Sequence, residues 1–230
     1  MVVMPVYNEE QALPLVVGEW MAVLESTVGN FQLLCLDDGS TDATPVLLQA
    51  LQQKHSRLRV LRGPNRGHGP TCLHGYRVAL ESGATWILQL DSDGQCESRC
   101  FADFWALRSR SCSLYGYRWP RGDGLHRSLI SRLLSLLVWA RTGVWTADPN
   151  VPFRLLHREG LAACLPSIPI DFHLANVALA VLQARRGEIV WRQIPFRQRL
   201  AGASKQSWQG LPRRAAQLWH QLGGLSSSHS

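Results

Sequence analysis

The first part of the chain alternates between short apolar runs and longer stretches with helical periodicity. Four apolar runs predict buried strands, at residues 1–6, 31–36, 57–62 and 85–90. The segments between them carry apolar residues at helical spacing, most clearly over residues 9–27. Strands and helices that alternate every 25 to 30 residues predict an α/β fold, with a mostly parallel, Rossmann-like sheet and helices on both faces.

The second part of the chain loses this regular alternation. Its pattern predicts, in order, a helix at 97–109, a strand at 112–117, an amphipathic helix at 128–141, helices at 158–165 and 171–186, and a late strand at 188–196.

No linker rich in Pro, Gly or Ser separates the two parts of the chain. We therefore expect a single domain over residues 1–222, built from an N-terminal half at 1–96 and a C-terminal helical and strand elaboration at 97–222. Residues 223–230 are predicted to form a mobile tail.

Charge is distributed unevenly along the chain. Residues 1–53 contain seven acidic and no basic residues, whereas the remainder carries all 24 Lys and Arg against ten acids. The later part is therefore expected to meet an anion, which could be a phosphate-bearing substrate, a lipid surface or nucleic acid. A hydrophobic content of 46% with 18% charged residues is typical of globular rather than disordered proteins.

Cysteine usage and apolar segment length limit the class of protein. The six cysteines lack paired CxxC spacing, which argues against zinc and favours reduced cytoplasmic thiols. No segment reaches the roughly 18 apolar residues of a membrane span. The longest candidate, Leu133–Ala140, is flanked by Arg132 and Arg141. The sequence therefore predicts a cytoplasmic chain that does not span a membrane on its own.

Two carboxylates, Asp91 and Asp93, follow the predicted strand at 85–90. They repel each other unless a cation lies between them, and carboxylates are ligands that suit Mg²⁺ or Mn²⁺. The alternative is that Asp91 caps the following helix and Asp93 lies in a turn. The pair alone does not decide between these interpretations.

Polar segments also follow the other predicted strands. "YNEE" comes after residues 1–6, and "DDGS" comes after residues 31–36. Ligands bind beyond the carboxyl ends of parallel strands, so these segments are expected to share one site with Asp91 and Asp93. The loop at 63–70 has the glycines to approach a phosphate, but it lacks the spacing of a P-loop or of GxGxxG.

The combination of motifs carries a family resemblance. "MPVYNEE", "DDGSTDAT", "NRGHGPTCLHGY" and "LQLDSDGQ", in this order, resemble the family 2 glycosyltransferases with the GT-A nucleotide-sugar-binding fold. In the second half, "YGYRWPRGDGLHR", "DPNVPFRLLHR" and "IPFRQRLAGASK" look like the dolichyl- and polyprenyl-phosphate sugar synthase branch. The resemblance covers roughly 200 residues.

The resemblance implies a role for each matching residue. The donor, a UDP- or GDP-linked sugar, would be bound in part by Pro5, Tyr7, Glu9, Leu36 and Asp38. Mg²⁺ or Mn²⁺ would be held by Asp91, Asp93 and Gln95, with Ser92 between the two carboxylates. Cationic phosphate contacts would come from Arg118, Arg127, Arg199 and Lys205, which would explain the basic second half without nucleic acid.

The chemistry expected of such a site is sugar transfer with loss of a nucleoside diphosphate, and the family resemblance implies inversion at the anomeric carbon. Asp93 and Arg199 are the candidates for stabilising leaving-group charge. A phosphate acceptor is already ionised, whereas a hydroxyl acceptor needs a carboxylate base. Asp148 is the candidate base or acceptor-positioning residue, and a turn-forming role before Pro149 is the alternative.

Three functions stay open at this point. The first is a metal-dependent glycosyltransferase acting on a polyprenyl phosphate, with peripheral contact to the cytoplasmic face of a membrane. The second uses the same donor with a saccharide or other hydroxyl acceptor. The third is a non-catalytic nucleotide-binding family member. Val-Pro in "DPNVPF" departs from the small residues usual in the lipid-phosphate branch, and the short first strand suggests a truncated start.

Overall fold

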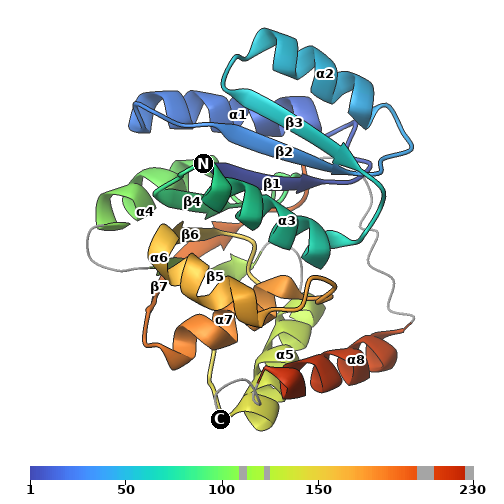
Figure 1. The fold of residues 1–230 in the computed structure, drawn as a ribbon, viewed down its shortest axis with the longest axis vertical. Coiled ribbons are helices and arrows are strands. Elements are labelled where there is room, and N and C mark those ends of the chain that lie inside the picture. Colours follow the sequence, from blue (N-terminus) through green and yellow to red (C-terminus); the bar gives the residue numbers. More distant parts are fainter. Residues whose placement is uncertain (109–112, 122–124, 201–209, 226–230) are drawn as a thin grey trace.

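The computed structural model describes residues 1–108, 113–121, 125–200 and 210–225. Seven strands in this part form one sheet in the order β3-β2-β1-β4-β6-β5-β7 (Figure 1). The strands are β1 (Val2–Val6), β2 (Leu33–Asp38), β3 (Leu58–Gly63), β4 (Trp86–Gln89), β5 (Ser113–Arg121), β6 (Arg154–His157) and β7 (Ile189–Phe196).

The sheet is mostly parallel. β6 runs antiparallel to both of its neighbours, β4 and β5, while every other pairing between the named strands of the described sheet is parallel. The predicted α/β fold with a mostly parallel sheet is therefore confirmed.

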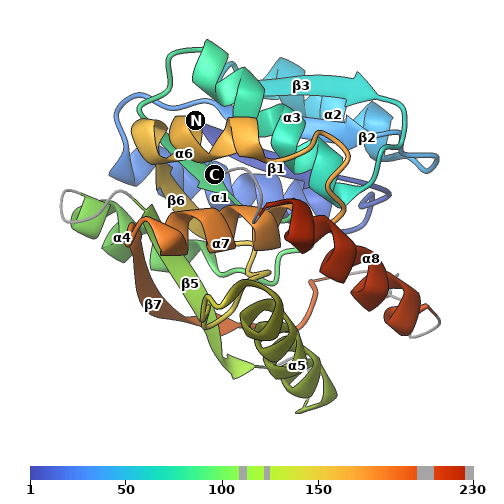
Figure 2. The same cartoon turned by 60° about the horizontal axis from the view of Figure 1, so that its bottom comes forward.

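Helices cover both faces of the sheet (Figures 1 and 2). α1 packs with α2 and α4, whereas α3 packs with α6 and α7 on the other side. The helices are α1 (Leu13–Thr27), α2 (Thr44–Lys54), α3 (His68–Glu81), α4 (Phe101–Leu107), α5 (Leu125–Thr142), α6 (Arg158–Cys164), α7 (Ala175–Arg185) and α8 (Leu211–Gly224), with short 3₁₀ turns at Ser98–Cys100 and Leu165–Ser167.

An aromatic cluster joins the two halves of the chain. The ring of Trp20 on α1 lies 6.1 Å from Phe101 and 5.9 Å from Phe153, and Phe104 meets Phe153 edge-to-face at 4.7 Å between centroids. All four side chains are buried. Because Phe153 directly precedes β6, this cluster fixes the antiparallel strand against the N-terminal half, as expected for one continuous domain core.

The structure differs from the sequence prediction in three places. β6 and α8 were not predicted, and α1 begins at Leu13 rather than at Glu9. The carbonyl of Glu9 accepts hydrogen bonds from the amides of Ala12 and Leu13, so the preceding residues form a turn. The predicted tail from residue 223 overlaps α8, which ends at Gly224 and is followed by the buried Leu225.

The strand order marks the carboxyl ends of β1 and β4 as the expected ligand-binding crevice. Strands β1 to β3 proceed outward in one direction and β4 lies on the other side of β1, so the order reverses there. Ligands of open α/β sheets bind at such a reversal, beyond the carboxyl ends of the strands. α5 and α8 project from the end of the molecule remote from α2 and β3 (Figure 2). No helix in the described part of the chain is both long and apolar enough to cross a bilayer.

Candidate functional site

The loops after β1 and β2 are joined by hydrogen bonds. Asn8 has a positive φ of 52°, and its Oδ1 accepts from the amide of Thr41 at 2.7 Å. The amide of Asn8 donates to Ser40 Oγ at 2.9 Å, and that of Glu9 donates to Thr44 Oγ1 at 2.8 Å. These bonds fix the turn that directs the Glu9 carboxylate toward the crevice.

Asp37 and Asp38, at the end of β2, accept hydrogen bonds from backbone amides of the following loops. Asp38 accepts from the amides of Arg66 and Gly67, at 2.8 and 2.9 Å. Asp37 accepts from the amide of Ser40 and pairs with Arg62 at 3.2 Å. Asp38 therefore shapes the loop before α3, and its predicted contact with a nucleoside stays a prediction.

The other residues predicted for the nucleoside lie nearby. Pro5 and Leu36 are register partners on β1 and β2 and are buried. Tyr7 follows β1 and is 38% exposed. The structure thus places Tyr7 and Glu9 just beyond the carboxyl end of β1, while Pro5 and Leu36 are buried in the neighbouring strands.

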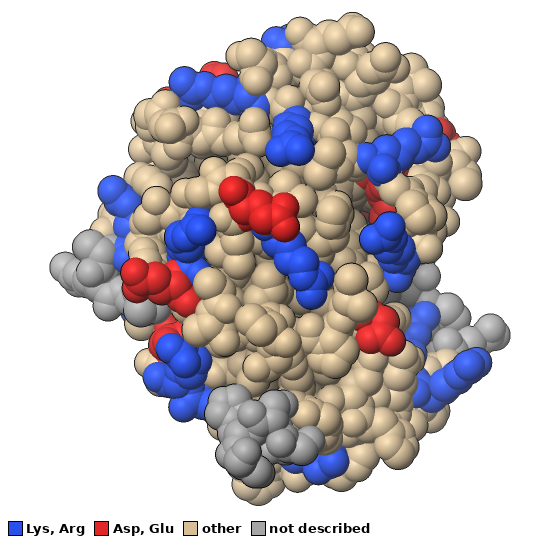
Figure 3. Space-filling view, viewed as in Figure 1, with Lys and Arg blue, Asp and Glu red and all other residues tan. Residues whose placement is uncertain are grey.

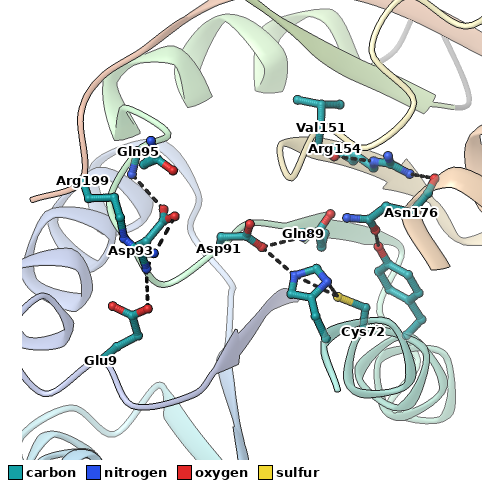
Figure 4. A network of polar contacts seen from close by, with 12 residues as sticks. Glu9, Cys72, Gln89, Asp91, Asp93, Gln95, Val151, Arg154, Asn176 and Arg199 are labelled. Carbon is teal, nitrogen blue, oxygen red and sulfur yellow. Dashed lines mark hydrogen bonds and ion pairs between the residues drawn. The ribbon is translucent and has the colours of Figure 1, made fainter. Parts of the chain in front are cut away.

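Asp91 and Asp93 follow β4 and have different partners (Figure 4). Oδ1 of Asp91 lies 3.0 Å from Nε2 of His68 and accepts from Nε2 of Gln89 at 3.3 Å. Oδ1 of Asp93 accepts from the Gln95 amide at 3.0 Å. The cations that face this pair are therefore protein side chains, His68 beside Asp91 and Arg199 beside Asp93.

The charged form of Asp93 is disfavoured in the folded protein. Burial, and then the charge of Asp91, raise the pKa of Asp93, which the Gln95 amide, Arg199 and His68 only partly oppose. Partial burial works against a charged ring at His68, but Cys72 and Asp91 raise the pKa of His68 well above its ordinary value. A further cation close to Asp93 would favour its ionised form.

A segment directly after β7, residues 197–200, lies along the loop that carries Asp93. The amide of Arg197 donates to Gln95 O at 3.1 Å, and that of Leu200 donates to Asp93 O at 3.3 Å. Arg197 also donates to Gly94 O at 2.6 Å and pairs with Glu19 on α1 at 2.6 Å. Gly94 has a φ of 71°, and a Cβ there would lie 2.5 Å from the Leu200 side chain, so glycine is required for this close approach.

This segment delivers Arg199 to the crevice. Its Nη2 lies 2.5 Å from Glu9 Oε1 and 3.8 Å from Asp93 Oδ2. Its Nε is buried and has no hydrogen-bond partner among the described residues. Arg199 therefore joins the loops after β1 and β4 and retains one N–H that a ligand oxygen can accept from.

Asp148 is tightly paired with Arg118. Its carboxylate accepts from Nε and Nη2 of Arg118, both at 2.7 Å, from the Arg118 amide at 3.3 Å and from Ser131 Oγ at 3.1 Å. Arg118 also lies over the ring of Phe196, 5.1 Å from its centroid. The pair links β5, α5 and the loop before β6, and it is nearly inaccessible to solvent.

Two further residues, Arg127 and Lys205, were predicted to contact phosphate, and the structure describes only the first of them. Arg127 lies in the first turn of α5 and is partly buried. Lys205 lies outside the described residues.

The residues present fit a divalent ion held jointly with a ligand. No cluster of three or more His, Cys, Asp or Glu suited to a metal occurs among the described residues. Asp91 and Asp93 nevertheless supply hard oxygen ligands, and Gln95, which donates through Nε2 to Arg197 O, retains an amide oxygen. Two or three protein oxygens completed by diphosphate oxygens and water are typical of Mg²⁺ sites.

Several residues of this site were missed by the sequence prediction. His68, Gln89 and Arg197 each contact the loop of Asp91 and Asp93, directly or through its backbone. His68 carried a weak signal as the residue after Gly67 at the start of α3. Gln89 and Arg197 lie within the motifs "LQLDSDGQ" and "IPFRQRLAGASK", but no role was assigned to either residue.

A family model now connects this geometry to known proteins. The model described as Glycosyl transferase family 2 matches residues 1–159, which is more than half of the chain and includes β1, β4 and the loops after them. The chain belongs to glycosyl transferase family 2. The predicted family is confirmed.

Among curated proteins, this family 2 chain is similar to transferases that act on undecaprenyl phosphate by name. It is 27% identical over 198 residues to the undecaprenyl-phosphate 4-deoxy-4-formamido-L-arabinose transferase of Pectobacterium atrosepticum, covering 80% of this chain and 59% of that one. The corresponding protein of Pseudomonas paraeruginosa is 28% identical over 201 residues, covering 81% and 58%. The chain thus spans about three fifths of the length of these relatives.

The fold has close structural neighbours. Glucosyl-3-phosphoglycerate synthase from Mycobacterium tuberculosis, solved with Mn²⁺, UDP-glucose and phosphoglyceric acid, aligns with a TM-score of 0.64 and 20% identity, covering 96% of this chain and 79% of that one. This similarity confirms the fold of the family 2 chain.

Proposed function

We propose that this protein transfers a sugar from a nucleotide sugar to a polyprenyl phosphate with the help of Mg²⁺ or Mn²⁺. The observation that carries the proposal is the placement of Asp91, Asp93 and Arg199 at the crevice between β1 and β4. The names of the curated relatives support a polyprenyl-phosphate acceptor, and the neighbour solved with UDP-glucose supports a UDP-linked donor.

The divalent ion would be held by Asp91, Asp93 and Gln95, and it would neutralise charge on the departing nucleoside diphosphate. Arg199 would bind the same diphosphate through its buried Nε, which has no hydrogen-bond partner among the described residues. Glu9, held 2.5 Å from Arg199, would keep that guanidinium oriented across the crevice. Both contributions stabilise charge that develops in the transition state.

The state of Asp148 favours a phosphate acceptor over a hydroxyl. A general base must be able to take a proton from the acceptor, but this carboxylate already accepts four hydrogen bonds, two of them from the Arg118 guanidinium. A polyprenyl phosphate needs no such base, because it is already ionised at neutral pH. Asp148 and Arg118 then serve to order the acceptor side of the site.

A screen of donors and acceptors tests this proposal. UDP- and GDP-sugars are incubated separately with a short-chain polyprenyl phosphate in detergent and with saccharide acceptors, and the products are read by mass. We expect a glycosylated lipid phosphate from a UDP-sugar, lost with EDTA and restored by Mn²⁺. Unchanged lipid phosphate with every donor, together with a glycosylated saccharide, would overturn the acceptor assignment.

Peripheral contact with a membrane is part of the same proposal. The outward side of α5 exposes Leu129, Leu133, Leu136 and Trp139, each about half accessible, and Trp119, Trp145 and Trp219 are also exposed. Residues 125–147 and 211–225 contain five arginines and no acids. In Figure 3 the charged side chains at the lower end of the molecule, beside α5 and α8, are basic. An apolar face with basic flanks is typical of binding to an anionic bilayer.

Vesicle binding measures this contact. We expect the protein to sediment with phosphatidylcholine vesicles that contain phosphatidylglycerol. The triple variant Leu129→Ser, Leu133→Ser, Leu136→Ser should bind more than about tenfold less, because each leucine loses apolar burial. The control variant Leu15→Ser, Val46→Ser alters equally exposed apolar residues on α1 and α2 and should bind as the parent does. Equal binding by both variants would contradict the assignment to α5.

A further inference from the structure

Gln89 is a buried polar residue that the fold itself does not fully use. It is the last residue of β4, and its side chain is inaccessible to solvent. Its Nε2 donates to Asp91 Oδ1 at 3.3 Å. Its Oε1 is buried and has no hydrogen-bond partner among the described residues. Burying an amide with an unpaired oxygen costs free energy, so an apolar residue would suit this position better if packing alone decided.

The neighbours of Gln89 have other partners. It lies in register with Arg154 on β6, so the two side chains share one face of the sheet. Arg154 is fully buried and donates to the carbonyls of Val151, Pro149 and Asn176, at 2.8, 2.7 and 2.6 Å. Figure 4 shows Gln89 between Asp91 and this group. Among the described residues, the one hydrogen bond of the Gln89 side chain thus goes to Asp91.

A second donor reaches the same oxygen of Asp91. Nε2 of His68, at the start of α3, lies 3.0 Å from Oδ1, where Nε2 of Gln89 also donates. Oδ2 of Asp91 has no hydrogen bond within the described residues. The two donors come from β4 and α3, so together they fix the carboxylate rotation and leave Oδ2 available.

We propose that Gln89 is a positioning residue for Asp91 that, together with His68, presents Oδ2 to the divalent ion. The inference rests on the proposed function, in which Asp91 binds the divalent ion. Carboxylate ligands of metals are oriented by hydrogen bonds from residues that do not touch the ion, and loss of such a partner lowers metal affinity by about 10–100-fold. The unpaired Oε1 is explained, because Gln89 is retained for its Nε2.

The test compares two buried glutamines. Gln89→Leu should weaken Mn²⁺ binding in the presence of UDP by about 10–100-fold, measured by titration calorimetry without acceptor, while the Tm stays equal to or above that of the parent. Gln183→Leu is the matched control. Gln183 is equally buried on α7, also has an unpaired amide atom among the described residues, and accepts from Tyr115 at 2.6 Å. It should lower the Tm and leave Mn²⁺ affinity unchanged.

Variants at His68 provide a second measurement at a half-exposed position, where folding is less at risk. His68→Phe should reduce Mn²⁺ affinity, whereas His68→Gln, which can still donate to Asp91, should retain more of it. Parental affinity in Gln89→Leu and His68→Phe would overturn the inference, as would equal affinity losses in Gln89→Leu and Gln183→Leu. If the parent protein itself binds UDP without any dependence on Mn²⁺, it is the proposed metal site that fails.

Discussion

Asp93→Asn should abolish metal-dependent UDP binding and lower kcat/KM for sugar transfer by at least about 10³-fold. The substitution preserves the size of the side chain, and Oδ1 can still accept from the Gln95 amide. What it removes is the negative charge that the divalent ion and Arg199 face. The measurement is titration calorimetry of UDP with and without Mn²⁺, together with initial rates over a range of donor concentrations.

The same variant is expected to keep its fold. Burial and Asp91 raise the pKa of Asp93 in the folded protein, so above the ordinary pKa of a carboxyl group its ionised form disfavours folding. Neutralising it should therefore leave the Tm unchanged or raise it. Asp103→Asn, which removes the exposed carboxylate on α4, is the matched control and should retain full activity. Mn²⁺-dependent binding that persists in Asp93→Asn would contradict the metal assignment.

Several polar groups in the site are poorly satisfied by the protein alone. Gln89 Oε1 and Arg199 Nε are buried without hydrogen-bond partners among the described residues, and Asp93 carries an unfavourable charge. Unpaired buried atoms also occur elsewhere in the described residues, for example at Gln183 and Asn176, so they do not mark the site by themselves. At Arg199 and Asp93, which lie close together, a bound metal diphosphate would relieve both the unpaired N–H and the unfavourable charge.

The sequence predicted the architecture where local periodicity decides it. Strands β1 to β4 are apolar runs separated by helical segments, so their parallel order and the site beyond their ends followed directly. β6 has only four residues, and it is recognisable as a strand only through its pairing with β4 and β5. α8 had usable signals, since Pro212 lies in its first turn and Leu218 and Leu222 are four residues apart, but no helix was predicted after residue 196.

The candidate site was predictable at its carboxylates and not at their partners. Asp91, Asp93 and Arg199 carry family motifs, and the structure brings them together. Gln89 and Arg197 lie in the same motifs, but their contacts depend on how β4 meets α3 and on how residues 197–200 lie along the loop of Asp93. Long-range contacts of this kind leave no local pattern, so sequence reasoning could not have found them.

Asp148→Asn is expected to lower the free energy of unfolding by about 3–5 kcal/mol, because it takes the charged, bidentate carboxylate partner from the nearly inaccessible Arg118 guanidinium. Chemical denaturation measures this loss. Ser131→Ala removes one neutral hydrogen bond from the same carboxylate and should cost only about 1 kcal/mol. The large difference between the two variants reflects the bidentate ion pair rather than the general packing of α5.

The double variant Arg118→Leu, Asp148→Leu distinguishes a structural role for Asp148 from a catalytic one. With both charges removed, stability should recover relative to Asp148→Asn, since the guanidinium is removed together with the carboxylate that it pairs with. Transfer to polyprenyl phosphate should then recover in part, because a phosphate acceptor needs no base from Asp148. If Asp148→Asn instead keeps parental stability and loses turnover, Asp148 acts as a base, and a hydroxyl acceptor becomes the better assignment.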